Sequence, residues 1–142
     1  MAGEVVLGYD GGEGSDAALA TAASIAAAFW RPLIIVFGYK PPQIGGEVGD
    51  LSRAIREVGE RVTHEALAKV HAIDASVDVS VQLVDDRPAE ALLRAGAEYE
   101  ALALVVPATD RGPIRGSLLG SVTYEVVHQS TRPVVVVPLP ED

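Results

Sequence analysis

The chain has 142 residues, of which 49% are hydrophobic and 22% are charged, so it can bury a core and is not a disordered chain. Its formal net charge is −9, which argues against binding to DNA or RNA, because Lys and Arg supply most of that affinity. It has no cysteine, which excludes disulfides and cysteine-based metal or thiol chemistry.

The first predicted elements are a strand, Glu4–Gly8, and an alanine-rich helix, Ser15–Phe29. The longest apolar stretch, Ala17–Trp30, is shorter than the roughly 20 residues that a membrane-spanning helix needs. The residues before it are acidic where a secretory signal would be basic: Glu4, Asp10, Glu13 and Asp16. We therefore expect a cytoplasmic protein with no membrane partner.

A second strand is predicted at Leu33–Phe37 and is followed by Lys40–Gly49, a segment with two prolines and three glycines. This segment is either a lid over a site or a plain connection. Asp50–Ala72 is predicted to be an amphipathic helix. Its apolar residues recur at spacings near three and four: Leu51, Ile55, Val58, Val62, Leu67 and Val70.

The next strand, Val77–Val84, alternates apolar and polar residues, which is typical of a strand toward the edge of a sheet. A helix begins at Pro88, where the missing N–H of proline is not needed. The remaining predicted elements are a strand at Ala101–Val106, a helix at Ser121–Gln129 and a final strand at Pro133–Val137.

Strands that alternate with helices predict the α/β class: an open five-stranded parallel sheet with helices on both faces, in a single domain over residues 1–142. In such sheets ligands bind beyond the carboxyl ends of the strands, where the strand order reverses. The loops that follow the first and fourth strands, Tyr9–Ser15 and Pro107–Ser121, are therefore the candidate site.

The glycine-rich connection Pro107–Ser121 leads from a buried strand to the start of a helix, a position suited to binding an anion. Two residues conflict with that role. Pro107 has no N–H to offer a phosphate, and Asp110 brings a negative charge.

Three segments together resemble universal stress proteins: Val5–Gly11 with Ser15–Leu19, Gly120–Val122, and Arg132–Pro138. The resemblance covers essentially the whole chain. It implies a small cytoplasmic Rossmann-like domain, similar to the adenine nucleotide alpha hydrolases, that dimerises and takes part in stress regulation without catalytic turnover.

Many members of that family bind ATP or AMP through the motif G-x-x-G, nine residues, then G-S or G-T. In a register without gaps, Pro107 and Asp110 replace the first two glycines, and Gly120–Ser121 keeps the final pair. The resemblance also implies that Asp10 contacts the nucleoside and that Gly38 lies near the base. The candidate ligand-binding residues are Asp10, Gly38, Val106, Pro107, Gly112, Gly116, Gly120, Ser121 and Val122.

Charge decides between nucleotides at this site. A carboxylate about 5 Å from a phosphate charge costs on the order of 3 kcal/mol at an effective dielectric of about 20. A helix N-terminus returns only about 0.3–1 kcal/mol. Arg111, Arg115 or a Mg²⁺ bound with ATP would offset the repulsion from Asp110, and Gly112 could replace a lost glycine. We therefore predict weak binding of ATP or AMP.

Other interpretations remain open for the same residues. Asp10 could cap the turn before the first helix, and Ser121 could be a simple N-cap. The loop Asp10–Ser15 also resembles the S-G-G-x-D-S loop of ATP pyrophosphatases, but two of its key residues differ and no substrate domain is present. The three histidines have no spacing typical of a metal site, and we predict neither a catalytic residue nor a metal.

The resemblance to universal stress proteins implies that the final strand, Pro133–Val137, lies at an edge of the sheet, where its unpaired backbone would be exposed. Pairing with the same strand of a second copy about a two-fold axis would cover that edge. We predict a homodimer, and a nucleotide-independent homodimeric interaction module is the alternative function.

Overall fold

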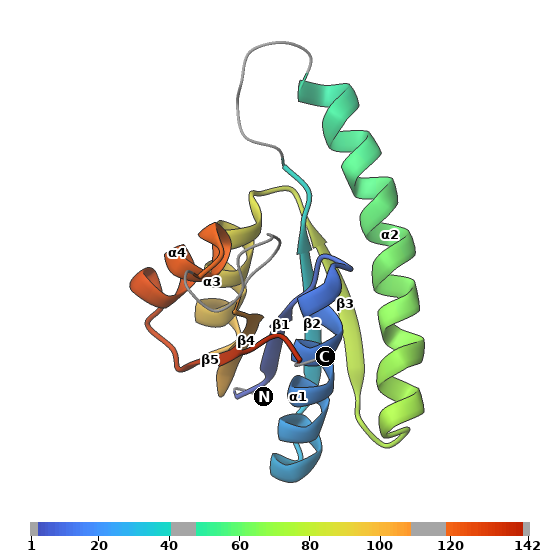
Figure 1. Ribbon diagram of the computed structural model, residues 1–142, viewed down its shortest axis with the longest axis vertical. Helices are drawn as coiled ribbons and strands as arrows, with labels where there is room; N and C mark the ends of the chain where they lie inside the picture. Colours follow the sequence, from blue (N-terminus) through green and yellow to red (C-terminus); the bar gives the residue numbers. More distant parts are fainter. Residues whose placement is uncertain (1–2, 41–47, 109–118, 141–142) are drawn as a thin grey trace.

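The computed structural model describes residues 3–40, 48–108 and 119–140 (Figure 1). Five strands alternate with four helices along this part of the chain. The elements are β1 (Val5–Gly8), α1 (Glu13–Phe29), β2 (Leu33–Gly38), α2 (Val48–Ile73), β3 (Val79–Val84), α3 (Pro88–Glu98), β4 (Ala103–Pro107), α4 (Ser121–Gln129) and β5 (Val134–Val137).

The strands form one sheet in the order β3-β2-β1-β4-β5, and every neighbouring pair is parallel. Helices α1 and α2 pack on one face of the sheet, while α3 and α4 pack against each other on the opposite face (Figure 1). The predicted α/β architecture is confirmed. Strand β3 lies at one edge, as its alternating sequence predicted, and β5 lies at the other, as the resemblance to universal stress proteins implied.

Two apolar clusters, one on each face of the sheet, form the core. Residues of the central strand alternate between them: Val5 and Leu7 belong to the cluster that includes α1, and Val6 belongs to the cluster that includes α3. All three side chains are fully buried. Continuous apolar strands therefore arise because both faces of the sheet are covered.

Several boundaries differ from the sequence prediction by one or two residues. Helix α1 begins at Glu13 because Gly12 takes the N-cap position, and α2 begins at Val48, inside the segment predicted as a lid or connection. Lys40 is described, but residues 41–47 of that segment lie outside the described residues. None of the described helices combines the length and apolar character needed to cross a membrane.

Candidate functional site

The carboxyl ends of β1 and β4 separate, and this is where the strand order reverses. Gly8 pairs with Val36 on β2, but the ladder between β1 and β4 ends one residue earlier, at Leu7 and Val105. A crevice at such a switch point is the usual ligand position in open α/β sheets.

A cavity of about 290 Å³ opens at this point. Five of the residues predicted from sequence line it: Asp10, Gly38, Val106, Pro107 and Val122. The others that line it are Gly8, Tyr9, Ser15, Val36, Phe37, Pro88, Leu92 and Thr123. The walls are therefore mostly apolar, with a few polar groups from the loop after β1 and the first turn of α4.

Asp10 both caps the loop and faces the cavity. Its Oδ1 accepts hydrogen bonds from the Gly12 N–H at 2.7 Å and from the Ser15 hydroxyl at 2.6 Å. The Asp10 N–H in turn donates to Ser15 Oγ at 3.2 Å. Gly11 has a φ of +81°, a conformation that glycine adopts without strain, and α2 packs closely there through Val62. This arrangement occupies Oδ1 and leaves Oδ2 for a ligand.

Beneath this loop, three polar side chains connect α1 to α2. The Tyr9 hydroxyl donates to Asp16 Oδ1 at 2.8 Å, and Lys69 Nζ lies 3.0 Å from the same oxygen. Burial and the hydrogen bond to Asp16 raise the pKa of Tyr9, and the hydrogen bond to Asp16 raises the pKa of Lys69. At neutral pH Tyr9 is therefore neutral and Lys69 is charged, so the link holds the start of α1 against α2.

The opposite wall is built from the end of β4 and the first turn of α4. The Thr123 hydroxyl donates to the Pro107 carbonyl at 2.6 Å, and the Gly120 N–H donates to the Ala108 carbonyl at 3.0 Å. The Ala108 N–H donates to the carbonyl of Val137 in β5 at 2.7 Å. The cavity wall is thus joined by hydrogen bonds to the edge strand.

The orientation of Pro107 shows which partner its missing N–H would have had. The N–H groups of Leu104 and Ala108 both point to β5, so the alternation along β4 turns position 107 toward β1. The donor that proline lacks would have joined Gly8 of β1 instead of facing a phosphate. The proline ends the β1–β4 ladder and helps to open the crevice.

The N-cap of α4 is Gly120, so the interpretation of Ser121 as the N-cap is wrong by one residue. Ser121 is the first helical residue and is exposed, and neither Gly120 nor Ser121 lines the cavity. Gly112 and Gly116 lie outside the described residues, as do Asp110, Arg111 and Arg115.

Sequence reasoning did not single out Pro88, Leu92 and Thr123 as site residues. Pro88 and Leu92 come from α3, whose preceding turn packs directly on Gly38: a Cβ there would lie 2.8 Å from the Asp86 carbonyl oxygen. The start of α3 could have been predicted as part of the site, because Pro88 follows the carboxyl end of a parallel strand, where ligands bind. Thr123 carries no such signal, since its role depends on the pairing with Pro107.

Chemically, the described walls offer one carboxylate, hydroxyl groups and apolar surface. Within residues 3–40, 48–108 and 119–140, no group of histidine and acidic side chains is placed to hold a metal ion. Such a site is suited to binding and orienting a ligand that has a flat apolar part and a few polar edges.

Comparison with known proteins identifies relatives over nearly the whole chain. The sequence model of the Universal stress protein family matches residues 1–138. A universal stress protein of Mycobacterium tuberculosis is 33% identical over 132 residues, which are 93% of this chain and 44% of that protein. This chain therefore spans less than half the length of that relative. A universal stress protein of Thermus aquaticus is 30% identical over 136 residues, 94% of this chain and 96% of that one.

Solved structures show the same architecture. A universal stress protein in complex with cAMP is 30% identical, with a TM-score of 0.77, over 97% of this chain and 98% of that chain. One from Archaeoglobus fulgidus in complex with dAMP has a TM-score of 0.75 at 17% identity, over 95% of this chain and 97% of that chain, and shows the fold alone.

Proposed function

Because this chain belongs to the universal stress protein family, we propose that it is a cytoplasmic, non-catalytic regulatory module of the stress response that binds an adenine nucleotide. The observation that carries the proposal is the cavity at the β1–β4 switch point, lined by Asp10 and Gly38. It also gathers Val106 and Val122, from the two elements that flank the phosphate motif of the family. A universal stress protein that is 30% identical to this chain has been solved in complex with cAMP.

In this proposal the adenosine part lies against Gly38 and Val106, with a hydroxyl or amino group donating to Asp10 Oδ2. The phosphate lies toward the first turn of α4, where the backbone N–H groups that follow Gly120 have no partner within the helix. Asp10 is the one charged side chain among the described cavity walls. A ligand with few negative charges, such as AMP or cAMP, is therefore favoured over ATP, which would require Mg²⁺ or the arginines at 111 and 115.

Titration calorimetry with AMP, cAMP and ATP, with and without Mg²⁺, tests the proposal. Asp10→Asn is the most informative variant. Its amide oxygen can still accept the hydrogen bonds from Gly12 and Ser15, while an NH₂ donor replaces the acceptor Oδ2. We expect at least a tenfold loss of affinity with an unchanged Tm, whereas Asp50→Asn on exposed α2 has no effect. Absence of binding at millimolar nucleotide would refute nucleotide recognition.

A second pair of variants separates the two departures from the family motif. Asp110→Gly removes a negative charge, so we expect it to raise the affinity for ATP. Pro107→Gly restores a donor that faces β1, and we expect little change in affinity. A larger gain in ATP affinity for Pro107→Gly than for Asp110→Gly would show that the N–H missing at position 107 does matter for binding, whichever strand it faces.

The alternative function, a homodimeric interaction module, is supported by the edge strand β5. The carbonyl groups of Pro133 and Val137 accept hydrogen bonds from β4, so the backbone groups of Val134 and Val136 point away from the sheet. We propose that β5 pairs with β5 of a second copy in the antiparallel sense, centred on Val135. Val134 of each copy then exchanges two hydrogen bonds with Val136 of the other.

A further inference from the structure

The outer face of α1 is an uncharged surface on a strongly charged protein. From Ala17 to Phe29 the helix contains no charged residue, although the chain carries a net charge of −9. Phe29 is 59% exposed, and Trp30, which ends the helix with a φ of 56°, is 91% exposed. A bulky residue held exposed in a left-handed conformation is an unfavourable choice for a solvated helix end.

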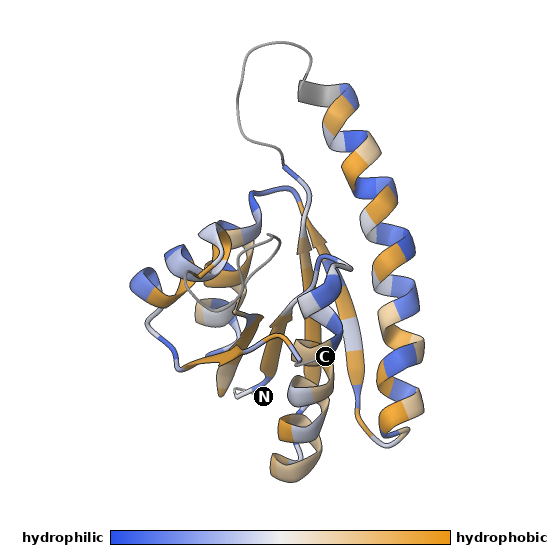
Figure 2. Cartoon of the chain, viewed as in Figure 1, coloured by the Kyte–Doolittle hydropathy of each residue, from blue (hydrophilic) through white to orange (hydrophobic). Residues whose placement is uncertain are grey.

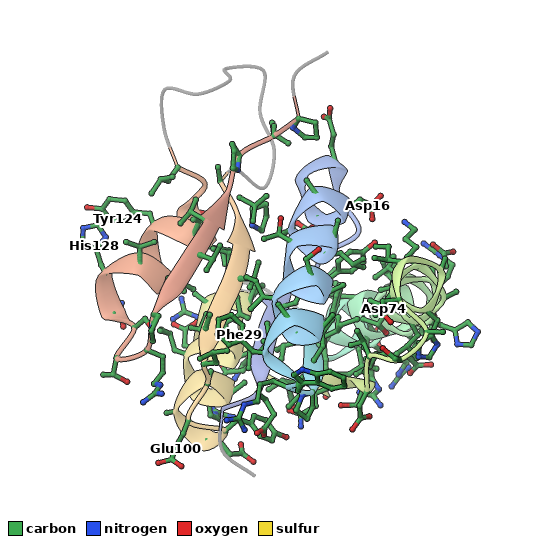
Figure 3. All side chains as sticks on the ribbon, turned by 90° about the horizontal axis from the view of Figure 1, so that it is seen from below. Asp16, Phe29, Asp74, Glu100, Tyr124 and His128 are labelled. Carbon is green, nitrogen blue, oxygen red and sulfur yellow. The ribbon has the colours of Figure 1, made fainter. Side chains whose placement is uncertain are left out.

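This face carries a shallow groove that is largely open to solvent. The groove is lined by Ala20, Thr21, Ser24, Ile25, Ala28 and Phe29. Asp16 marks the side of α1 that faces α2, since it pairs with Lys69. Ile25 lies about 180° around the helix from Asp16 at 3.6 residues per turn, so the groove is on the side away from α2. Figure 3 shows Asp16 toward α2 and Phe29 toward β4.

We propose that the same face of α1 in a second copy packs against this groove and forms the second layer of the dimer interface. This inference rests on the β5 pairing proposed above. An antiparallel pairing that continues the sheet has its two-fold axis perpendicular to the sheet, so the two α1 helices lie on the same face on either side of the seam. The groove therefore faces its own copy.

The spacing of the elements determines how far side chains must reach across the seam. Helix α1 packs on both β4 and β1, and β4, the nearer of the two, is one and a half strand spacings, or about 7 Å, from the seam. The two helices therefore lie at least about 14 Å apart, against about 8–10 Å for closely packed helices. Long side chains fill the difference, and Ile25 and Phe29 are the long apolar side chains of the groove.

The groove runs along α1 from Ala20 to Phe29. A two-fold axis makes the two helices run in opposite directions, so Phe29 of one copy lies toward the Ala20 end of the groove of the other.

Charge favours a second copy as the occupant. Two molecules that each carry −9 repel one another except where both surfaces lack charge. Exposed apolar side chains of comparable size also occur on α4, at Tyr124 and Val127, and on α2, where Leu51 and Val58 alternate with charged residues (Figure 2). The charged residues of α1, Glu13 and Asp16, lie in its first turn, whereas residues 17–29 and the neighbouring residues 133–140 all lack charge, so these two stretches offer one continuous surface for self-association.

Sedimentation equilibrium of Phe29→Glu tests the inference, with Leu51→Glu as the matched control because Leu51 is 51% exposed on α2. We expect Phe29→Glu to raise the dimer Kd at least tenfold and Leu51→Glu to leave it unchanged. A dimer that Val136→Pro dissociates but Phe29→Glu does not would overturn the α1 contact alone. A wild-type monomer at tens of micromolar would overturn the β5 pairing and the α1 contact together.

Cross-linking adds a direct measure of distance, and the absence of native cysteine makes it unambiguous. Ile25→Cys should give a covalent dimer with a short bismaleimide in solution. Ile73→Cys, at the far end of α2 and 50% exposed in the wild type, should remain monomeric under the same conditions. Equal cross-linking at both positions would contradict the proposed arrangement.

Discussion

The two edges of the sheet, β3 and β5, differ in how each is protected from other chains. Both have backbone groups directed outward: those of Val79 and Val81 in β3, and those of Val134 and Val136 in β5. Along β3, polar side chains alternate with apolar ones, and α2 packs on the strand. Along β5, four valines follow one another between two prolines.

This difference matches the proposed dimer, in which β5 is covered by a second copy and β3 remains single. Asp78 and Ser80 are exposed at the β3 edge, and charged or polar residues there discourage strand pairing. The valines of β5 are only partly buried until its last residue. In a chain with a net charge of −9, an uncharged edge is where two copies can approach.

Proline substitutions at matched positions of β5 and β3 should give the largest difference in dimer affinity between the two edges. Val136→Pro removes an outward N–H from β5 without removing a bond to β4, and we expect a rise of at least a hundredfold in the dimer Kd. Val81→Pro removes an outward N–H from β3 in the same way and should leave the Kd unchanged. Analytical ultracentrifugation measures both, and equal effects would show that the two edges do not differ.

The junction between β5 and the cavity should respond to Thr123→Val. Thr123 is buried and donates to the carbonyl of Pro107, which would be left without that partner, so we expect a loss of about 1–3 kcal/mol in the free energy of unfolding. Thr63→Val is the control, because buried Thr63 donates to Gly59 O within α2, a carbonyl that the helix itself can satisfy. Urea denaturation compares the two variants, and an equal loss would contradict a special role for the junction.

Replacing the polar residues of the β3 edge with apolar ones should allow β3 to associate with other chains. Asp78→Val with Ser80→Val gives β3 the apolar character of β5, so we expect species larger than a dimer at about 100 μM, within the range in which unpaired strand edges aggregate. Light scattering after gel filtration measures the mass. The single variant Asp78→Asn separates the contribution of charge from that of apolar surface, and an unchanged mass for the double variant would show that α2 alone protects this edge.

The fold class could be predicted because strands and helices alternate along the chain and differ in periodicity. The alternation of Val77–Val84 identified one edge, the resemblance to universal stress proteins implied the other at Pro133–Val137, and the strand-end rule located the cavity through Asp10 and Pro107. Thr123 could not be found in this way, since its importance arises from a hydrogen bond across 16 residues. The orientation of Pro107 was equally hidden, because it depends on which neighbour each residue of β4 faces.

The link between α1 and α2, on the β3 side of the molecule, should give the smallest effect, visible only at alkaline pH. The pKa values of Tyr9 and Lys69 are raised in the folded protein, so the stability that they contribute is complete below their unfolded values and is lost as the pH rises through the folded values. Since those unfolded values are about 10 for tyrosine and 10.4 for lysine, the free energy of unfolding should be level from pH 7 to about 9.5 and fall above about 10. Tyr9→Phe should make that fall less steep, whereas Tyr124→Phe, which changes an exposed side chain, should not. Urea denaturation between pH 8 and 11 measures the slope. If the free energy of unfolding of the wild type began to fall below pH 9, another group would have to be titrating. The contacts of Tyr9 and Lys69 with Asp16 would then not account for the alkaline loss of stability.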